Sequence, residues 1–379
     1  MTGQRTPTPS EHAANHLVRA AVTAPSLHNS QPWLFAYSDS RVLLYADDTR
    51  RLPLADPRGR QQVISCGAAL FNLRLAMRHL GFRPTVRFFP DTPEYVPLVQ
   101  VEWGAYARMT SDETLMHRSM RRRHTHRGPF QAASVPASLI EALRQQAHAE
   151  GAGLCAMDDP TSQLRLAALV REAEQLRRNT PAYTAELNRW TRVGDAPRDD
   201  GVPAEACAFH PDCTALAGRD FTGLTRHPDT AAPPWKWSTR TGITVLLTTP
   251  HDSRQDWLRA GQALQRVLLY AAGHNVAAGF HTQPLEVADL RARVRATVPS
   301  GQHPQMILRL GYTNDRVRTP RRPVTDVLAR DNGLRPTAST PARWREPRGP
   351  ARGSRSPAQE VTCAAPPRPG TQRGAEPRG

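Results

Sequence analysis

An internal repeat is the feature that most constrains the fold of this chain. Residues 65–82 and 259–275 are two apolar segments in which a Gly-x-Ala-Leu pattern recurs, beginning at Gly67 and at Gly261. Both segments place small and apolar residues at helical spacing and carry too much apolar surface for a solvent-facing helix. The pattern predicts two buried, central helices, one in each of two related units.

Strand-like segments flank both predicted helices in the same order. Runs of apolar residues precede the helices at 42–45 and 244–247, and further runs follow them at 96–103 and 304–312. Two copies of a strand, helix and strand unit predict an α+β fold in which mixed or antiparallel sheets pack with helices. We expect the two halves to be fused as a pseudo-dimer within one chain, so that the chain is a monomer.

The two halves are unequal in length. We expect an N-terminal half over 1–110 and a C-terminal half over 111–330, in which residues 131–232 have no counterpart. Asp159, followed by Pro160, has the pattern of a helix N-terminus within this insertion. The turn-rich stretch beyond it predicts a lid at about 180–235, because a long connection in a compact protein is either disordered or covers a site.

Charge and composition exclude several classes of protein. The chain of 379 residues has a net charge of +16 and a mean hydropathy of −0.55, and no apolar run approaches the length that crosses a bilayer. The N-terminal segment has no secretory pattern, so we expect a cytoplasmic protein without a membrane partner. Residues 331–379 hold nine arginines, four acids and nine prolines, which predicts a disordered tail. Nucleic acid is not the expected partner, because no aromatic-interleaved basic face is evident.

The segment 24–33 has the most distinctive sequence. It reads APSLHNSQPW and places short polar side chains between Pro25 and a second proline. Prolines restrict the backbone, while Ser26, Asn29 and Gln31 supply donors and acceptors for a flat heterocycle. A capped turn between a helix and a strand is the alternative, but it does not explain Asn29 together with Gln31.

Two arginine-rich segments are candidates for a phosphate site. Residues 121–130 read RRRHTHRGPF, and residues 318–323 read RTPRRP. Guanidinium groups donate two hydrogen bonds at once to phosphate oxygens. The first segment alone is more typical of a solvated surface, so the prediction of a phosphate site requires that the two segments converge in space.

A third candidate lies after the second buried helix, where residues 283–286 read QPLE. The backbone N–H groups that follow Pro284 are expected to point outward, where they are available to a ring nitrogen. Cys207, His210 and Cys213 form a weak zinc pattern, so no metal site is predicted. Cys66, at the start of a buried helix, is expected to belong to the core.

Together these segments resemble the nitroreductase-fold FMN flavoproteins, and more closely their Acg-like branch, in which two nitroreductase-type halves are fused. The resemblance covers about residues 12–330 and implies an FMN cofactor. It also implies an oxidoreductase that passes electrons from NAD(P)H to a small acceptor such as a nitroaromatic or quinone. The alternative is a protein that sequesters or stores FMN beneath a lid. No catalytic side chain is implied, since the flavin carries the chemistry.

The resemblance also assigns cofactor-binding residues position by position. The phosphate ligands would come from both arginine-rich segments, and the backbone of the QPLE loop would face the flavin. The residues implied are Pro25, Ser26, Asn29, Gln31, Arg123, His124, Thr125, Arg127, Pro284, Leu285, Glu286, Arg321 and Arg322. Residues 230–240 keep only a Pro-Trp pair of the heterocycle-contacting string, so one FMN per chain is expected. Lys236 is the only lysine and lies in that degenerate string. Unless an arginine replaces the lysine that relatives place near the flavin, the reduced flavin loses a stabilising charge.

Overall fold

The computed structural model describes residues 9–38, 40–90, 97–192, 198–207, 216, 218–221 and 242–331. The tail from 332 onward and much of the predicted lid lie outside this range, and so do Lys236, His210 and Cys213. Within the described residues no helix is long and apolar enough to cross a membrane.

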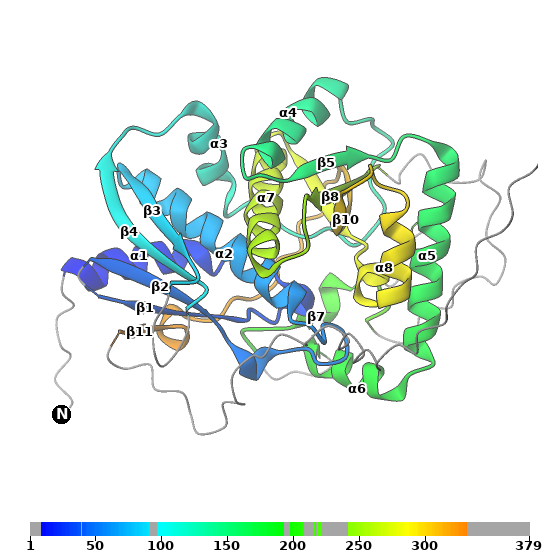
Figure 1. The fold of residues 1–379 in the computed structure, drawn as a ribbon, viewed down its shortest axis with the longest axis horizontal. Coiled ribbons are helices and arrows are strands. Elements are labelled where there is room, and N and C mark those ends of the chain that lie inside the picture. The colour runs from blue at the N-terminus through cyan, green and yellow to red at the C-terminus, as the bar shows by residue number, and fades with distance from the viewer. Residues whose placement is uncertain are drawn as a thin grey trace, which may run out of the picture. The chain divides into compact units, whose positions relative to one another are not determined.

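Two separate sheets form the framework (Figure 1). The first has the order β11-β1-β2-β4-β3, and the second has the order β5-β8-β10-β9. All neighbours are antiparallel except β11, which pairs in parallel with β1. The strands are β1 (Trp33–Tyr37), β2 (Arg41–Ala46), β3 (Phe82–Phe88), β4 (Val99–Tyr106), β5 (Gly153–Ala156), β8 (Ile243–Thr249), β9 (Val276–Phe280), β10 (His303–Tyr312) and β11 (Leu328–Arg330).

The two sheets share one topology. The order β1-β2-β4-β3 corresponds strand by strand to β5-β8-β10-β9, with a long helix between the second and third strand of each set in chain order. The α+β class and the four strands predicted from the flanking apolar runs are confirmed. The domain boundaries stay a prediction, and β11 shows that the last described residues return to the N-terminal sheet, where Phe35 pairs with Leu328.

The repeated helices α2 (Arg60–His79) and α7 (Arg254–Gly273) pack against each other in the middle of the molecule (Figure 1). A Cβ atom placed on Gly67 would lie 2.3 Å from the carbonyl oxygen of Leu258, and one on Gly261 would lie 2.0 Å from that of Ile64. Each glycine therefore faces the carbonyl three residues before the other. This reciprocal contact is what a twofold relation between the halves requires.

In the described part of the chain, six further helices lie around this centre. The helices α1 and α2 bury Leu17 and Leu70 against the five-stranded sheet, whereas α5 and α8 bury Val170 and Val294 against Ile307 of the second sheet. Asp159 caps α5 as predicted, since its carboxylate accepts from the N–H of Ser162 at 2.7 Å. The bounds are α1 (Pro9–Ala21), α3 (Ser111–Ser119), α4 (Ala137–His148), α5 (Pro160–Arg178), α6 (Pro181–Trp190) and α8 (Ala288–Arg295).

Three strands of the two four-strand sets escaped the sequence analysis for physical reasons. The strand β3 lies at the edge of its sheet and contains Pro84, a residue that edge strands tolerate. The strand β9 reads VAAGF, whose alanines and glycine have low strand propensity, and β5 has only four residues. These strands form because neighbouring strands pair with them, which is tertiary information.

The described part of the predicted lid has a small apolar core of its own. Tyr183 and Leu187 of α6 pack with Phe221 against Leu52 and Ala55, which precede α2. The short strands β6 (Thr191–Arg192) and β7 (Val202–Pro203) pair in parallel in the same region. The insertion is thus attached to the N-terminal half.

Candidate functional site

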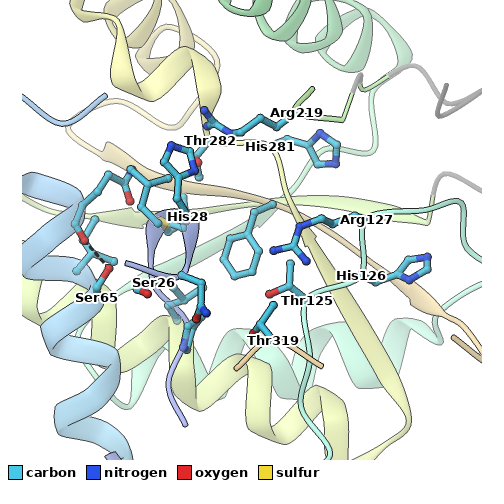
Figure 2. Close-up of a pocket in the computed structure, with 18 of the residues that line it drawn as sticks. Ser26, His28, Ser65, Thr125, His126, Arg127, Arg219, His281, Thr282 and Thr319 are labelled. Carbon is cyan, nitrogen blue, oxygen red and sulfur yellow. Dashed lines mark hydrogen bonds between the residues drawn. The ribbon is translucent and has the colours of Figure 1, made fainter. Parts of the chain in front are cut away.

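A cavity lies where the two halves meet, beside the helices α2 and α7 (Figure 2). Ile64 and Ser65 of α2 and Leu264 of α7 form part of its wall. Every segment predicted to bind a phosphate or a ring, except the QPLE loop, contributes residues to this cavity. The predicted site residues that line it are Pro25, Ser26, Asn29, Thr125, Arg127 and Arg321. Figure 2 shows Thr125, Arg127 and Thr319 on one side and Ser26, His28 and Ser65 on the other.

Other predicted site residues do not line this cavity. They are Gln31, Arg123, His124, Pro284, Leu285, Glu286 and Arg322. Arg123 and His124 instead line a second cavity near the start of β9. The N–H of Leu285 was expected to be available to a ligand, but it is not. It donates a hydrogen bond of 2.9 Å to Thr282 O, which closes the turn η6 (Gln283–Glu286).

The loop that follows α1 has an unusual backbone. His28, Asn29 and Gln31 have φ angles of 53°, 54° and 51°, a left-handed conformation that is costly for most residues other than glycine. A hydrogen bond of 2.9 Å from the N–H of Gln31 to Ser26 Oγ closes the loop. Hydrogen bonds of the side chains of Asn29 and Gln31 hold the remainder of the loop in place.

Asn29 and Gln31 join three segments that are far apart in sequence. Asn29 Nδ2 donates to the carbonyl oxygens of Gly201 at 2.9 Å and Pro320 at 3.1 Å, while its Oδ1 accepts from Arg321 at 3.0 Å. Gln31 Nε2 donates to Asp199 O at 2.7 Å, and its Oε1 accepts from the N–H of Arg322 at 2.8 Å. These amides therefore position the loop and the second arginine-rich segment.

The two arginine-rich segments converge, as the phosphate hypothesis requires. Arg123 and Arg321 both donate to the carbonyl oxygen of Thr23, at 3.3 and 3.4 Å. Burial and the charge of Arg127 lower the pKa of Arg123 to about 10, and burial with both neighbouring arginines lowers the pKa of Arg321 to about 9. Burial likewise lowers the pKa of Arg127 to about 10. All three remain cations at neutral pH.

No carboxylate compensates this charge within the described part of the chain, where Arg123, Arg127 and Arg321 form no ion pair. Arg123 Nε and Nη1 and Arg321 Nε are buried without a hydrogen-bond partner. Buried cations that repel one another and have no carboxylate partner are costly in the free protein, and an anion would relieve that cost. Arg322 differs, since its guanidinium lies 3.3 Å from Asp47.

Glu286 connects the QPLE turn to the insertion. Its buried carboxylate accepts from Arg219 at 2.6 Å and from Arg177 of α5. Arg219 also donates to the hydroxyl of Tyr183, and the guanidinium of Arg177 lies 4.6 Å from the centre of the Tyr183 ring. Glu286 is thus an anchor for the segment that contributes Arg219 to the cavity wall.

Several residues of the cavity wall were not identified from the sequence. They are His28, Gln61, Ser65, His126, Arg219, Phe221, His281, Thr282, Arg309 and Thr319. His28 and Thr319 lie inside segments that had been singled out, so their position was the available signal. Arg219 and Phe221 lie in the predicted lid, whereas Arg309 carried no such signal, because it reaches the cavity only through the packing of β10.

Cys66 is fully buried, as expected of a core residue. Its thiol lies 3.3 Å from Pro32 O, and burial raises its pKa. A thiol that stays protonated is a poor nucleophile.

Sequence comparisons identify relatives that match more than four fifths of the chain. An uncharacterized protein of Mycobacterium tuberculosis is 32% identical over 323 residues, which cover 82% of this chain and 91% of the relative. Two further proteins of that organism are named "Putative NAD(P)H nitroreductase", and one of these is called acg. Both are 31% identical, and the alignments cover 84% and 82% of this chain and 92% and 93% of the relatives. No protein-family model matches the chain.

The chain therefore belongs to the nitroreductase superfamily. Its likeness to the acg protein confirms the Acg-like branch expected from the sequence motifs. Among solved structures, it is similar to a nitroreductase-like protein of Anabaena variabilis, with a TM-score of 0.44, 10% identity and coverage of 82% of this chain and 90% of the other. A nitroreductase with bound FMN from Bacteroides fragilis gives a TM-score of 0.34 at 11% identity, covering 59% and 98%.

Proposed function

We propose that this protein binds FMN in the cavity beside α2 and α7 and is an NAD(P)H-dependent oxidoreductase for a small acceptor such as a nitroaromatic or quinone. Relatives named as NAD(P)H nitroreductases support the reaction class. The observation that carries the proposal is the convergence of Arg123, Arg127 and Arg321 without a carboxylate partner in the described chain.

The residues at the arginine end fit a phosphate monoester. Arg127 and Arg321 line the cavity together with Thr125 and Thr319, which carry hydroxyl groups. Arg123 lines the neighbouring second cavity, and its positive charge acts on Arg321. Guanidinium and hydroxyl donors around one point satisfy the oxygens of a phosphate. Arg321, rather than Arg322, is the ligand that we propose from the second segment.

The rest of the cavity fits a flat ring with polar edges. Ile64, Leu264, Phe280 and Met306 supply apolar walls, and Gln61 Nε2 is buried without a partner and is available to donate to a ring carbonyl. Such a combination of apolar walls and a few directed polar groups is typical of cofactor pockets. The site therefore fits FMN at both of its ends.

Bound here, FMN would be the electron carrier, which takes a hydride from NAD(P)H and passes two electrons to the acceptor. The chain's own residues bind and orient. The arginines hold the phosphate, the loop of Ser26 and Asn29 shapes one wall, and Phe221 of the insertion excludes water. A quinone gains the hydride equivalent and one proton from solvent to give a hydroquinone, while NAD(P)⁺ leaves.

The purified protein tests this proposal directly. We expect it to be yellow and to release about one FMN per chain, because only the N-terminal half has the Ser26, Asn29 and Gln31 set. NADH or NADPH should bleach the flavin under anaerobic conditions, and a quinone should restore the colour. A chain that retains no FMN after reconstitution would refute the proposal.

A protein that holds FMN with little turnover is the second candidate, and a specific contact favours it. The ring of Phe221 lies 5.8 Å from that of His28, and the guanidinium of Arg127 lies 5.5 Å from it. The insertion thus contacts both sides of the cavity, where it would exclude a stacked nicotinamide. Bleaching by dithionite but not by NADH or NADPH would establish this second function.

A further inference from the structure

His28 is the unusual member of the loop that shapes the cavity. The amides of Asn29 and Gln31 both donate and accept hydrogen bonds, whereas both ring nitrogens of His28 are buried without a partner among the described residues. His28 is only 5% exposed and lines the cavity. Leaving a buried polar atom unpaired costs stability, so an apolar residue would be better for folding alone.

Cations surround this histidine. Burial, followed by the charges of Arg219, Arg177 and Arg127, holds the pKa of His28 well below its ordinary value. The imidazole is therefore neutral, with one N–H donor and one lone-pair acceptor. Figure 2 shows it close to Arg219, on the side of the cavity opposite Thr125 and Thr319.

The position separates His28 from the arginine end. Its ring meets Phe221 edge-on, with planes 87° apart, so it lies against the insertion on the side of the cavity opposite Thr125 and Thr319 (Figure 2). A ligand between the flavin and the insertion would meet the imidazole. A neutral imidazole N–H polarises an oxygen of such a ligand without transferring a full charge.

We propose that the imidazole N–H of His28 binds the electron acceptor by donating to an oxygen atom of it, a quinone carbonyl or a nitro oxygen. This inference rests on the proposed function. The nearby arginines favour the same class, because negative charge accumulates on that oxygen as electrons arrive. The overall reaction is unchanged, since solvent supplies the protons.

The test uses the FMN-loaded protein reduced with one equivalent of dithionite, which removes NAD(P)H from the measurement. His28→Leu deletes both nitrogens, His28→Asn retains a donor and an acceptor at a left-handed position, and His148→Leu is the same change at an exposed site on α4. Re-oxidation is followed with benzoquinone, with nitrobenzene and with ferricyanide, which accepts an electron without a carbonyl or nitro oxygen.

We expect His28→Leu to slow re-oxidation by benzoquinone, nitrobenzene or both about tenfold, the loss of one hydrogen bond, with ferricyanide and FMN affinity unchanged. His28→Asn should recover part of the rate, and His148→Leu should match the wild type. Re-oxidation of His28→Leu by benzoquinone and by nitrobenzene at wild-type rates would overturn the inference. Weaker FMN binding in this variant would also overturn it, because it would assign His28 to the cofactor. Failure of the wild type to bind FMN would instead refute the proposed function itself.

Discussion

Replacing Gly261 by alanine tests whether the repeated helices must touch at their backbones. The added Cβ would lie 2.0 Å from Ile64 O and 2.8 Å from Gly67 Cα, whereas real Cβ atoms keep at least 3.0 Å. Because the obstacle is backbone, α2 and α7 must separate by about 1 Å. Overpacking of this kind costs about 3 kcal/mol, and the better helix propensity of alanine returns about 1 kcal/mol.

We therefore expect Gly261→Ala to lower the free energy of unfolding by about 2 kcal/mol in urea titrations. FMN affinity should fall as well, because Ile64, Ser65 and Leu264 line the cavity within one turn of the contact. Gly273→Ala is the matched control on the same helix, since its Cβ would meet only the movable side chain of Leu115.

The double variant gives a sharper result. Gly67→Ala produces the reciprocal clash, at 2.3 Å from Leu258 O, so one separation of the helices accommodates both changes. The combined loss should be smaller than the sum of the single losses. Wild-type stability in Gly261→Ala, or strict additivity in the double variant, would refute the reciprocal contact.

Three further predictions concern the site and its surroundings. Arg321→Ala should weaken FMN binding at least tenfold by fluorescence titration, and Arg322→Ala should weaken it less because Asp47 pairs with that residue; equal losses would contradict this assignment. Burial, followed by the charges of His79 and His16, lowers the pKa of His117 to about 4 from 6.5, so its contribution to stability should be lost as pH falls from about 6.5 to about 4. His117→Gln should flatten that part of the pH profile of the melting temperature, and an unchanged profile would argue against it. Glu286→Gln should release Arg177 and Arg219, and it should speed NAD(P)H oxidation if the insertion limits access to the flavin. Glu141→Gln, on the exposed face of α4, is the control. An unaltered rate of NAD(P)H oxidation with FMN retained would show that the insertion is not the barrier.

Local patterns in the sequence were sufficient for the elements that depend on short-range physics. The apolar period of α2 and α7, the cap of α5 at Asp159 and the strands β2 and β10 all follow from neighbouring residues. The repeat of Gly67 and Gly261 also indicated two related halves, because close packing of backbones leaves a trace in the residue type itself.

Tertiary structure alone decided which candidate residues share a site. The convergence of Arg123 and Arg321 on Thr23 depends on the return of the chain to the N-terminal sheet as β11, a pairing between residues 35–37 and 328–330. The hydrogen-bond partner of a side-chain amide or carboxylate likewise cannot be predicted from the neighbouring residues in the sequence. Gln31 therefore proved to be bonded to Asp199 and Arg322, and Glu286 to Arg219, while the two ring nitrogens of His28 have no hydrogen-bond partner among the described residues.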